Sequence, residues 1–385
     1  MTPTFDLDLL RARFPSLPRL TYFNSGSYGL LAREVRAAFD TYLDRREEVG
    51  ADWGGWVIAL EQAREKVARL LSVSGDEVAI TASASAGINA VASALDYAAR
   101  PKVIVSNFEF PSGAQIWHAQ ERAGAQVVHV PESEDGLIPL DHFLREIDAS
   151  TAIVALSQVC YRNGGRTPDA DIRAICQMAQ AKGALVLLDG YQMVGTCPVE
   201  PAALGVDFYV GGFLKYLLGT AGAGFLYASA QATRALTPRT SGWFTQADIE
   251  AMDIFANTPS PTARRFEAGT PPVPSLGAVS AGLDLVLDLG LPAIGAWVSA
   301  LSGHALHRLD EAGIAVGSPV APDRRGPLLT IPARDDNALV AALAQHDIVT
   351  SCRDGRLRAG FHAYNTLADV DHLVDALVAN RALLA

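Results

Sequence analysis

The chain has 385 residues, which is more than one hydrophobic core usually serves, so we expect two lobes. Hydrophobic residues make up 49% and charged residues 19%, which excludes a disordered chain. The formal net charge of -11 would repel a nucleic-acid backbone or an anionic membrane, so neither is an expected partner. Four cysteines without a C-x-x-C pair, and an N-terminus without an apolar run, favour a reducing, cytoplasmic environment.

The elements expected in the first 230 residues are those of an α/β protein. The first 45 or so residues have a helical pattern and no strand partner of their own. Beyond residue 50, β-rich runs alternate with longer helical patterns, and the runs lie at 78–82, 102–106, 125–130, 151–157 and 184–189. Strands separated by helices predict a mostly parallel sheet, in which ligands gather at the carboxyl ends of the strands.

The sequence pattern changes after about residue 258. A proline-rich stretch at 271–274 leads into long helical patterns, and these are followed by an apolar run at 328–331. Two paired segments, 348–351 and 356–359, complete what we interpret as a smaller α+β lobe. We therefore expect a large domain at 50–258 and a small domain that combines 1–49 with 259–385.

Lys215 is the lysine that most needs an explanation. The chain has only four lysines, and this one lies in 211-GGFLKYLLG-219 among phenylalanine and leucine. Such neighbours desolvate the amine, lower its pKa and favour the neutral, nucleophilic form that a Schiff-base lysine needs. The alternative is a lysine whose charged end reaches solvent from the end of a strand.

Two further features point to a phosphate-bearing cofactor with a cationic ring nitrogen. Asp189 closes the apolar run at 184–189, where its carboxylate could pair with the ring nitrogen of pyridoxal phosphate, although position alone also fits a capping residue. The segment 81-TASASAGIN-89 joins a strand to a helix and offers free amides to a phosphate, but an ordinary capped helix would look the same.

Four motifs in order carry a resemblance to a known family. They are Asp189 with Gln192, 215-KYLLGTAGAGFL-226, 265-RFEAGT-270 and 358-RAGFHAYNT-366. Together they resemble the class V aminotransferase family of fold type I, which includes cysteine desulfurases, selenocysteine lyases, kynureninase, isopenicillin N epimerase and some aminotransferases. The resemblance implies a fold type I α/β enzyme that binds pyridoxal phosphate, acts on an amino acid, and forms a homodimer with shared active sites.

The resemblance also implies roles for individual residues. Lys215 resembles the lysine that holds the cofactor, Asp189 the partner of the pyridine nitrogen, and Arg358 the arginine that binds the substrate carboxylate. The remaining positions expected to contact the cofactor are Ala84, Ser85, Phe110, Tyr161 and Gln192, with Gly269 and Thr270 supplied by the neighbouring subunit. The segments 24–29 and 241–244 would border the substrate through Asn24, Ser25 and Trp243, and no metal site is expected.

Some positions depart from the family pattern. Cys352 lies six residues before Arg358 without the usual histidine and glycine company, so we expect no persulfide chemistry. Phe213 and Leu214 stand where relatives often place polar residues against the phosphate.

A β-lyase is the leading interpretation; an aminotransferase or epimerase of the same family and an inactive cofactor-binding scaffold are alternatives. A nicotinamide dehydrogenase is disfavoured because 219-GTAGAG-224 lacks the dinucleotide fingerprint.

Overall fold

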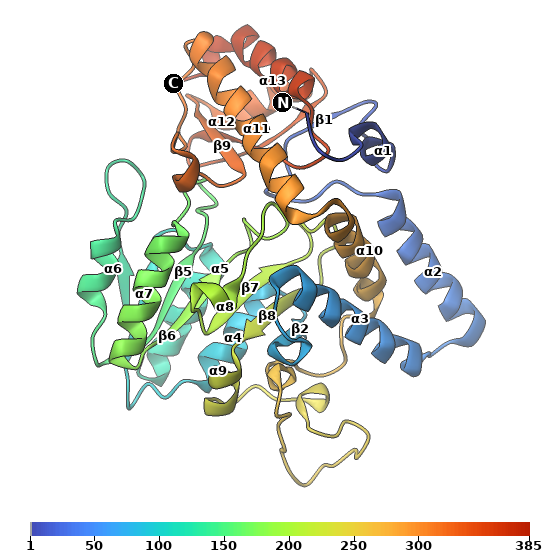
Figure 1. Cartoon of the computed structure of the whole chain (residues 1–385), viewed down its shortest axis with the longest axis vertical. Coiled ribbons are helices and arrows are strands. Elements are labelled where there is room, and N and C mark those ends of the chain that lie inside the picture. Colours follow the sequence, from blue (N-terminus) through green and yellow to red (C-terminus); the bar gives the residue numbers. More distant parts are fainter. Residues whose placement is uncertain (1) are drawn as a thin grey trace.

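The computed structural model describes residues 2–385, which form a larger body built on a seven-stranded sheet and a smaller body above it (Figure 1). The strands are β1 Thr21–Tyr22, β2 Val78–Thr81, β3 Lys102–Ser106, β4 Gln126–Val130, β5 Thr151–Ser157, β6 Leu185–Asp189, β7 Phe208–Gly212, β8 Gly224–Ala228, β9 Leu328–Pro332, β10 Ile348–Val349, β11 Ser351–Arg353 and β12 Arg356–Gly360. The α-helices are α1 Leu7–Ala12, α2 Arg33–Val49, α3 Trp53–Leu71, α4 Ala84–Ala94, α5 Pro111–Ala119, α6 Leu140–Glu146, α7 Asp169–Lys182, α8 Pro201–Leu204, α9 Ala230–Ala235, α10 Val273–Leu289, α11 Leu291–Glu311, α12 Asp336–Ala344 and α13 Leu367–Ala379.

The large sheet has the strand order β2-β8-β7-β6-β5-β3-β4. Neighbours from β7 to β4 are parallel, and β8 runs antiparallel to both β2 and β7. The expected mostly parallel sheet is confirmed, and each of the five β-rich runs forms one of the strands β2 to β6. Strands β7 and β8 were not anticipated, because glycines interrupt the β-rich pattern on both sides of Lys215.

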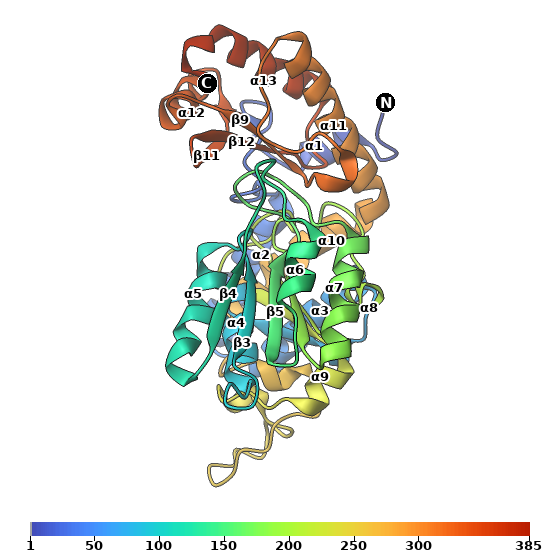
Figure 2. The same cartoon turned by 90° about the vertical axis from the view of Figure 1, so that its left-hand side faces the viewer.

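Both faces of the large sheet are covered. Val103 and Val105 of β3 pack in a cluster with Trp117 of α5, whereas Ile104 between them packs in another cluster with Ile175 of α7. This alternation follows from the two-residue period of a strand and accounts for the nearly continuous apolar runs. Figure 2 shows α4 and α5 on one side of the strands and α7 and α8 on the other.

The smaller body contains the antiparallel sheet β11-β12-β9. Its β11–β12 hairpin turns through Asp354 and Gly355, whose φ angles of 56° and 69° match the two-residue turn that Asp-Gly favours. The expectation that the first 45 residues are helical is wrong in one respect, because they contain β1, which pairs in parallel with β10. Two residues are too few to produce an alternating pattern in the sequence.

The N-terminal and C-terminal segments meet in the smaller body, where Arg11 of α1 bonds Asp369 of α13 at 2.9 Å. Helices α2 and α3 pack instead on α10 (Figure 1). We propose the same division as above, 50–258 and 1–49 with 259–385, with α10 in contact with both parts.

No single helix of residues 2–385 is long and apolar enough to cross a membrane, and the consecutive helices α10 and α11 bend by 79°.

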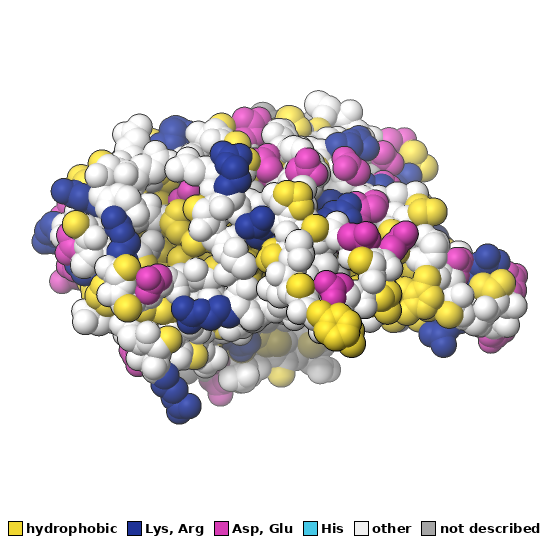
Figure 3. All heavy atoms as spheres, turned by 90° about the horizontal axis from the view of Figure 1, so that it is seen from below, with side chains coloured by type: hydrophobic (Ala, Val, Ile, Leu, Met, Phe, Trp, Pro, Cys, Tyr) yellow, Lys and Arg dark blue, Asp and Glu magenta, His cyan; other side chains and the backbone are white. Residues whose placement is uncertain are grey.

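A loop over residues 246–258 projects from the lower end of the molecule (Figure 1). Three of its apolar side chains are largely exposed: Met252 at 66%, Ile254 at 84% and Phe255 at 93%. Figure 3, seen from below, shows hydrophobic side chains at the surface of this end of the molecule. Apolar residues gathered on a projecting loop are typical of a contact surface.

Candidate active site

A cavity of about 350 Å³ lies at the carboxyl ends of β5 and β6. This is the position at which parallel α/β sheets bind ligands. Eight of the site residues predicted from the sequence line it together: Ala84, Ser85, Phe110, Tyr161, Asp189, Gln192, Lys215 and Arg358. Tyr191 and Arg353, which were not among the predicted site residues, also line the cavity.

Lys215 lies in the loop between β7 and β8, with its side chain in the cavity wall. Its Nζ lies 4.3 Å from the centre of the Tyr191 ring and 5.8 Å from the centre of the Phe110 ring. Burial lowers the pKa of Lys215 to about 8; the Arg358 charge acts in the same direction, and the Asp189 carboxylate opposes both. A useful fraction of the amine is therefore neutral and nucleophilic near neutral pH.

Two glycines allow the chain to close around this lysine. The amide of Gly29 donates to the carbonyl of Leu214 at 2.6 Å, and a Cβ at Gly29 would lie 2.2 Å from the Lys215 carbonyl oxygen. A Cβ at Gly212 would lie 2.2 Å from the ring of Tyr191. Both positions need glycine because any side chain would overlap its neighbour, so the N-terminal segment and the Tyr191 ring can both approach the lysine loop.

Asp189 and Gln192 present polar atoms at the end of β6. Asp189 Oδ1 accepts a hydrogen bond from the Tyr191 amide at 2.8 Å. Burial raises the pKa of Asp189, whereas that hydrogen bond and the nearby Lys215 oppose the rise. Gln192 Nε2 donates to the Gly26 carbonyl at 3.0 Å, and its Oε1 is buried without a partner. A buried polar atom at a cavity wall without a partner is a position where a ligand group fits.

The first turn of α4 borders the same cavity. Ser83 caps the helix by accepting a hydrogen bond from the Ala86 amide at 3.1 Å, so the helix begins at Ala84 as the sequence suggested. Ser83, Ala84 and Ser85 all line the cavity. Because the first amides of a helix lack intrahelical partners and lie at the positive end of its dipole, they suit a phosphate.

Glu109 is a buried acid beside this site that sequence reasoning overlooked. Ser106 Oγ donates to Glu109 Oε1 at 2.8 Å, and the residue is 8% exposed. Burial first, and the negative charge of Asp189 second, raise the pKa of Glu109 to about 8. Glu109 therefore carries a proton at neutral pH. Phe110 was expected to contact the cofactor, but its neighbour Glu109 was not expected to be a second buried carboxyl group at this site.

Arg358, on β12, brings a buried guanidinium into the cavity. It is 4% exposed, and no ion pair within 4.0 Å includes it among residues 2–385. Its donors are held by neutral oxygens: Nη1 by the Tyr161 carbonyl at 2.7 Å, and Nη2 by Ser27 Oγ at 2.9 Å and Ser351 Oγ at 3.1 Å. A buried, oriented cation without a counter-ion is prepared for an anionic ligand.

Cys352 lies on β11, opposite Leu357 of β12. Its neighbours Ser351 and Arg353 face the site, since Ser351 bonds Arg358 and Arg353 lines the cavity. Successive strand residues face opposite ways, and Cys352 accordingly contacts α12, with Sγ 3.6 Å from Asn337 Oδ1. Burial, helped by the nearby Asp336, raises the pKa of the Cys352 thiol.

Five predicted site residues lie outside the walls of this cavity. Ser25 Oγ bonds the Tyr364 hydroxyl, and Asn24 forms a bridge with Gly360, while their neighbours Gly26 and Ser27 reach the cavity. Trp243 packs on Trp53, with ring centres 5.3 Å apart. The other two, Gly269 and Thr270, are exposed.

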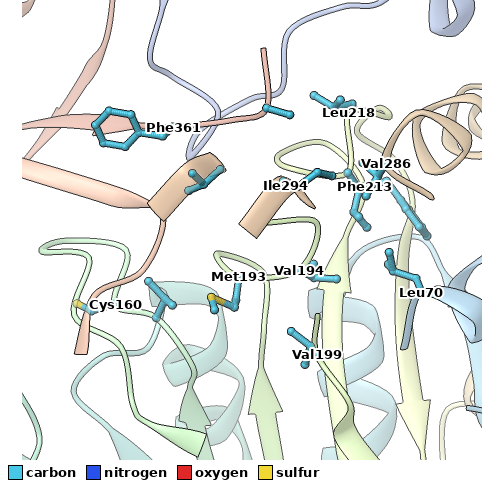
Figure 4. Close-up of a cluster of buried hydrophobic side chains, with 14 of the residues drawn as sticks. Leu70, Cys160, Met193, Val194, Val199, Phe213, Leu218, Val286, Ile294 and Phe361 are labelled. Carbon is cyan, nitrogen blue, oxygen red and sulfur yellow. The ribbon is translucent and has the colours of Figure 1, made fainter. Parts of the chain in front are cut away.

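Phe213, which replaces a polar residue of the family pattern, is not part of the cavity. It is fully buried, with its ring centre 5.6 Å from that of Phe225. Figure 4 shows it near Val286 in the hydrophobic cluster. Leu214, the next residue, does line the cavity. The substitution thus places an aromatic side chain in the core.

Comparison with known proteins agrees with this geometry. The Aminotransferase class-V family model matches residues 55–373, so the chain belongs to the class V aminotransferase family. It is 31% identical to the uncharacterized aminotransferase YcbU of Bacillus subtilis, with 96% of each chain covered, and 28% identical to a probable cysteine desulfurase of Streptomyces coelicolor, with 97% and 96% covered. The cysteine desulfurase CsdA of Escherichia coli superposes with a TM-score of 0.85 at 26% identity, covering 99% of this chain and 100% of that one.

The chain is therefore a fold type I enzyme that depends on pyridoxal phosphate. The cavity fits that cofactor in three respects: a lysine with a lowered pKa, a carboxylate at the end of β6, and free helix amides at the start of α4. The partnerless Oε1 of Gln192 adds a fourth polar group at the same wall. These are the groups that an amine-reactive aldehyde, a ring nitrogen and a phosphate need.

Proposed function

We propose that the chain is a β-lyase that cleaves the bond from Cβ to sulfur or carbon in a small amino acid, without a protein persulfide. The orientation of Cys352 supports the second half of this proposal most directly. A sulfur-accepting thiol has to reach the substrate and ionise, whereas Cys352 lies in a hairpin strand, contacts α12 and has a raised pKa.

In this proposal the residues around the cavity would hold pyridoxal phosphate. The amides of Ala84 and Ser85 would bind its phosphate, Asp189 would pair with the ring nitrogen, and Phe110 would pack on the ring. Gln192 and Tyr161 would contact the ring hydroxyl. When bound, pyridoxal phosphate withdraws electrons from the substrate Cα, and Asp189 supports this because its carboxylate stabilises a protonated ring nitrogen.

Lys215 has two tasks in the proposed reaction. It holds the cofactor before substrate binds, and afterwards its neutral amine takes the Cα proton, for which a pKa of about 8 is well suited. Arg358 binds the substrate carboxylate through a two-bond fork and so orients Cα toward Lys215. Arg353, a second cation at the cavity wall, favours substrates or leaving groups that carry negative charge.

We also propose that the active form is a homodimer. The exposed Gly269 and Thr270 would complete the phosphate site of the second subunit, as the family resemblance implies. The apolar residues on the loop over 246–258, which projects from the lower end of the molecule in Figure 1, supply a surface for such a contact. In such a dimer the substrate would be bordered only indirectly by Asn24, Ser25 and Trp243, either through the residues next to them or from the other subunit.

The experiment is a substrate panel on the purified, cofactor-saturated protein. L-cysteine, a cysteine S-conjugate, L-cysteine sulfinate and L-alanine are supplied with and without an α-keto acid, and pyruvate, released sulfur and new amino acid are quantified. A lyase that acts without a persulfide releases pyruvate and ammonia from L-cysteine or the S-conjugate, or alanine and sulfite from L-cysteine sulfinate, without the keto acid; alanine formed from L-cysteine would need a sulfur acceptor and would contradict this part of the proposal. Amino transfer that requires the keto acid would favour the second candidate, an aminotransferase, which the 31% identity to YcbU supports. Racemised product would indicate an epimerase, and no turnover of any substrate would favour a cofactor-binding scaffold.

A further inference from the structure

A second cavity, of about 130 Å³, lies away from the active site. Its walls come from the segment after β6, from α11 and from the segment 322–327, and Met193, labelled in Figure 4, is one of its apolar residues. It shares no lining residue with the cavity that contains Lys215. A single water needs only about 10–15 Å³ of such space, so a molecule of several atoms fits.

Arg325 lines this cavity and is 8% exposed. No ion pair within 4.0 Å includes it among the described residues 2–385. Its guanidinium contacts only neutral oxygens, the Val320 carbonyl through Nη1 and Ser302 Oγ at 3.5 Å through Nη2. A buried cation with no counter-ion is costly for a fold, so a partner anion would stabilise this arrangement.

Arg166 lines the same cavity and has one N–H group that is free to donate a hydrogen bond. Its Nη2 pairs with Asp169 at 2.8 Å, but its Nε is buried without any partner. The two arginines are brought together by the backbone, because Gly165 bridges Arg325 and the Arg166 amide donates to the Arg324 carbonyl at 2.8 Å. Two guanidinium groups and one carboxylate leave one unbalanced positive charge.

We propose that this second cavity binds a small oxyanion, such as sulfate, phosphate or a short carboxylate, between Arg166 and Arg325. Guanidinium groups bind such oxygens with paired, charge-assisted hydrogen bonds, and the hydroxyl of Ser299 on α11 adds a further polar group. The anion would join the loop after β5 to α11 and to the segment 322–327. The site is distinct from the cofactor phosphate site and from Arg358.

The test measures the melting temperature of the protein saturated with pyridoxal phosphate, so that the cofactor site is filled. Sulfate, phosphate and acetate are each added at an ionic strength held constant with sodium chloride. A ligand at about ten times its dissociation constant should raise the melting temperature by roughly 1–3 °C. Comparison of the three salts distinguishes a tetrahedral anion from a carboxylate.

Variants assign the response to this cavity. Arg325→Met should abolish the rise, while melting no lower than the native protein in chloride, because it removes an unpaired buried charge. Arg334→Met, at an exposed arginine outside both cavities, is the matched control and should keep the rise. If Arg325→Met does not fold, Arg166→Met provides the same comparison.

Two results would overturn the proposal. One is a native protein whose melting temperature does not respond to any of the three anions beyond the chloride control. The other is an equal response in Arg325→Met and Arg166→Met. If both variants kept the rise in melting temperature and Arg358→Lys lost it, the anion would bind in the active-site cavity instead.

Discussion

Replacing Glu109 with glutamine should make the protein more stable at alkaline pH. The folded state holds the Glu109 pKa at about 8, whereas the carboxyl of an unfolded chain has a pKa near 4.5. Between these values the folded state binds a proton that the unfolded state has released, so native stability falls as pH rises. Each pH unit in this window costs up to about 1.4 kcal/mol, or about 2–3 kcal/mol from pH 6 to pH 8. Glutamine stays neutral, so the variant does not lose this part of its unfolding free energy as pH rises.

The assay is urea unfolding of the apoprotein at pH 5, 6, 7 and 8, for the native chain and Glu109→Gln. The amide keeps an acceptor for Ser106 Oγ, so the contact at 2.8 Å can persist in the variant. The stability difference between variant and native protein should move in favour of the variant as pH rises. Glu47→Gln, at an exposed residue of α2, is the control and should show a difference that does not change with pH.

A Glu109→Gln difference that stays constant from pH 5 to pH 8 would refute the reasoning. It would mean that Glu109 is ionised in the folded protein across this range, and that the Ser106 hydrogen bond outweighs burial and the charge of Asp189. A difference that moves against the variant would mean that the folded protein stabilises the carboxylate.

Three further predictions concern the proposed site. Arg358→Lys should raise KM about 10- to 100-fold with little change in cofactor affinity, since one charge-assisted hydrogen bond is lost; an unchanged KM would argue against the carboxylate role. Cys352→Ala should retain sulfur release and the cofactor spectrum, and loss of sulfur release alone would identify a nucleophile. Thr270→Ala should weaken pyridoxal phosphate binding about 10-fold while light scattering still reports a dimer; unaltered affinity would remove the shared-site proposal.

Much of the fold could be predicted from the sequence, because the central strands are apolar on both faces and therefore stand out as short runs. The five runs became β2 to β6. Of the two segments expected to pair, 356–359 lies in β12, whereas 348–351 divides between β10, which pairs with β1, and the first residue of β11, which pairs with β12. Strands β7 and β8 were missed since glycines flank Lys215, and β1 because two residues carry no period. These errors concern places where tertiary packing decides the backbone conformation.

The site residues that could be predicted are those whose role is indicated by the sequence immediately around them. Lys215 and Asp189 could be read from an apolar setting and a strand end. Glu109 could not, since its importance comes from Asp189, which is distant in sequence, and Arg353 could not, since its place in the cavity wall depends on how β11 is oriented in the folded chain. The orientation of Cys352 also required the structure, because it depends on the register between β11 and β12.

The central claim is that Lys215 holds the cofactor, and the scarcity of lysine makes a direct measurement possible. The other lysines are Lys66 and Lys102, which pair with Asp284 and Asp148, and the exposed Lys182. The yellow, cofactor-loaded protein is reduced with borohydride, digested and mapped by mass spectrometry, with Lys215→Ala as the control. We expect a single pyridoxyl adduct, on Lys215, and none in the variant. An adduct on one of the other three lysines, or its persistence in Lys215→Ala, would contradict it.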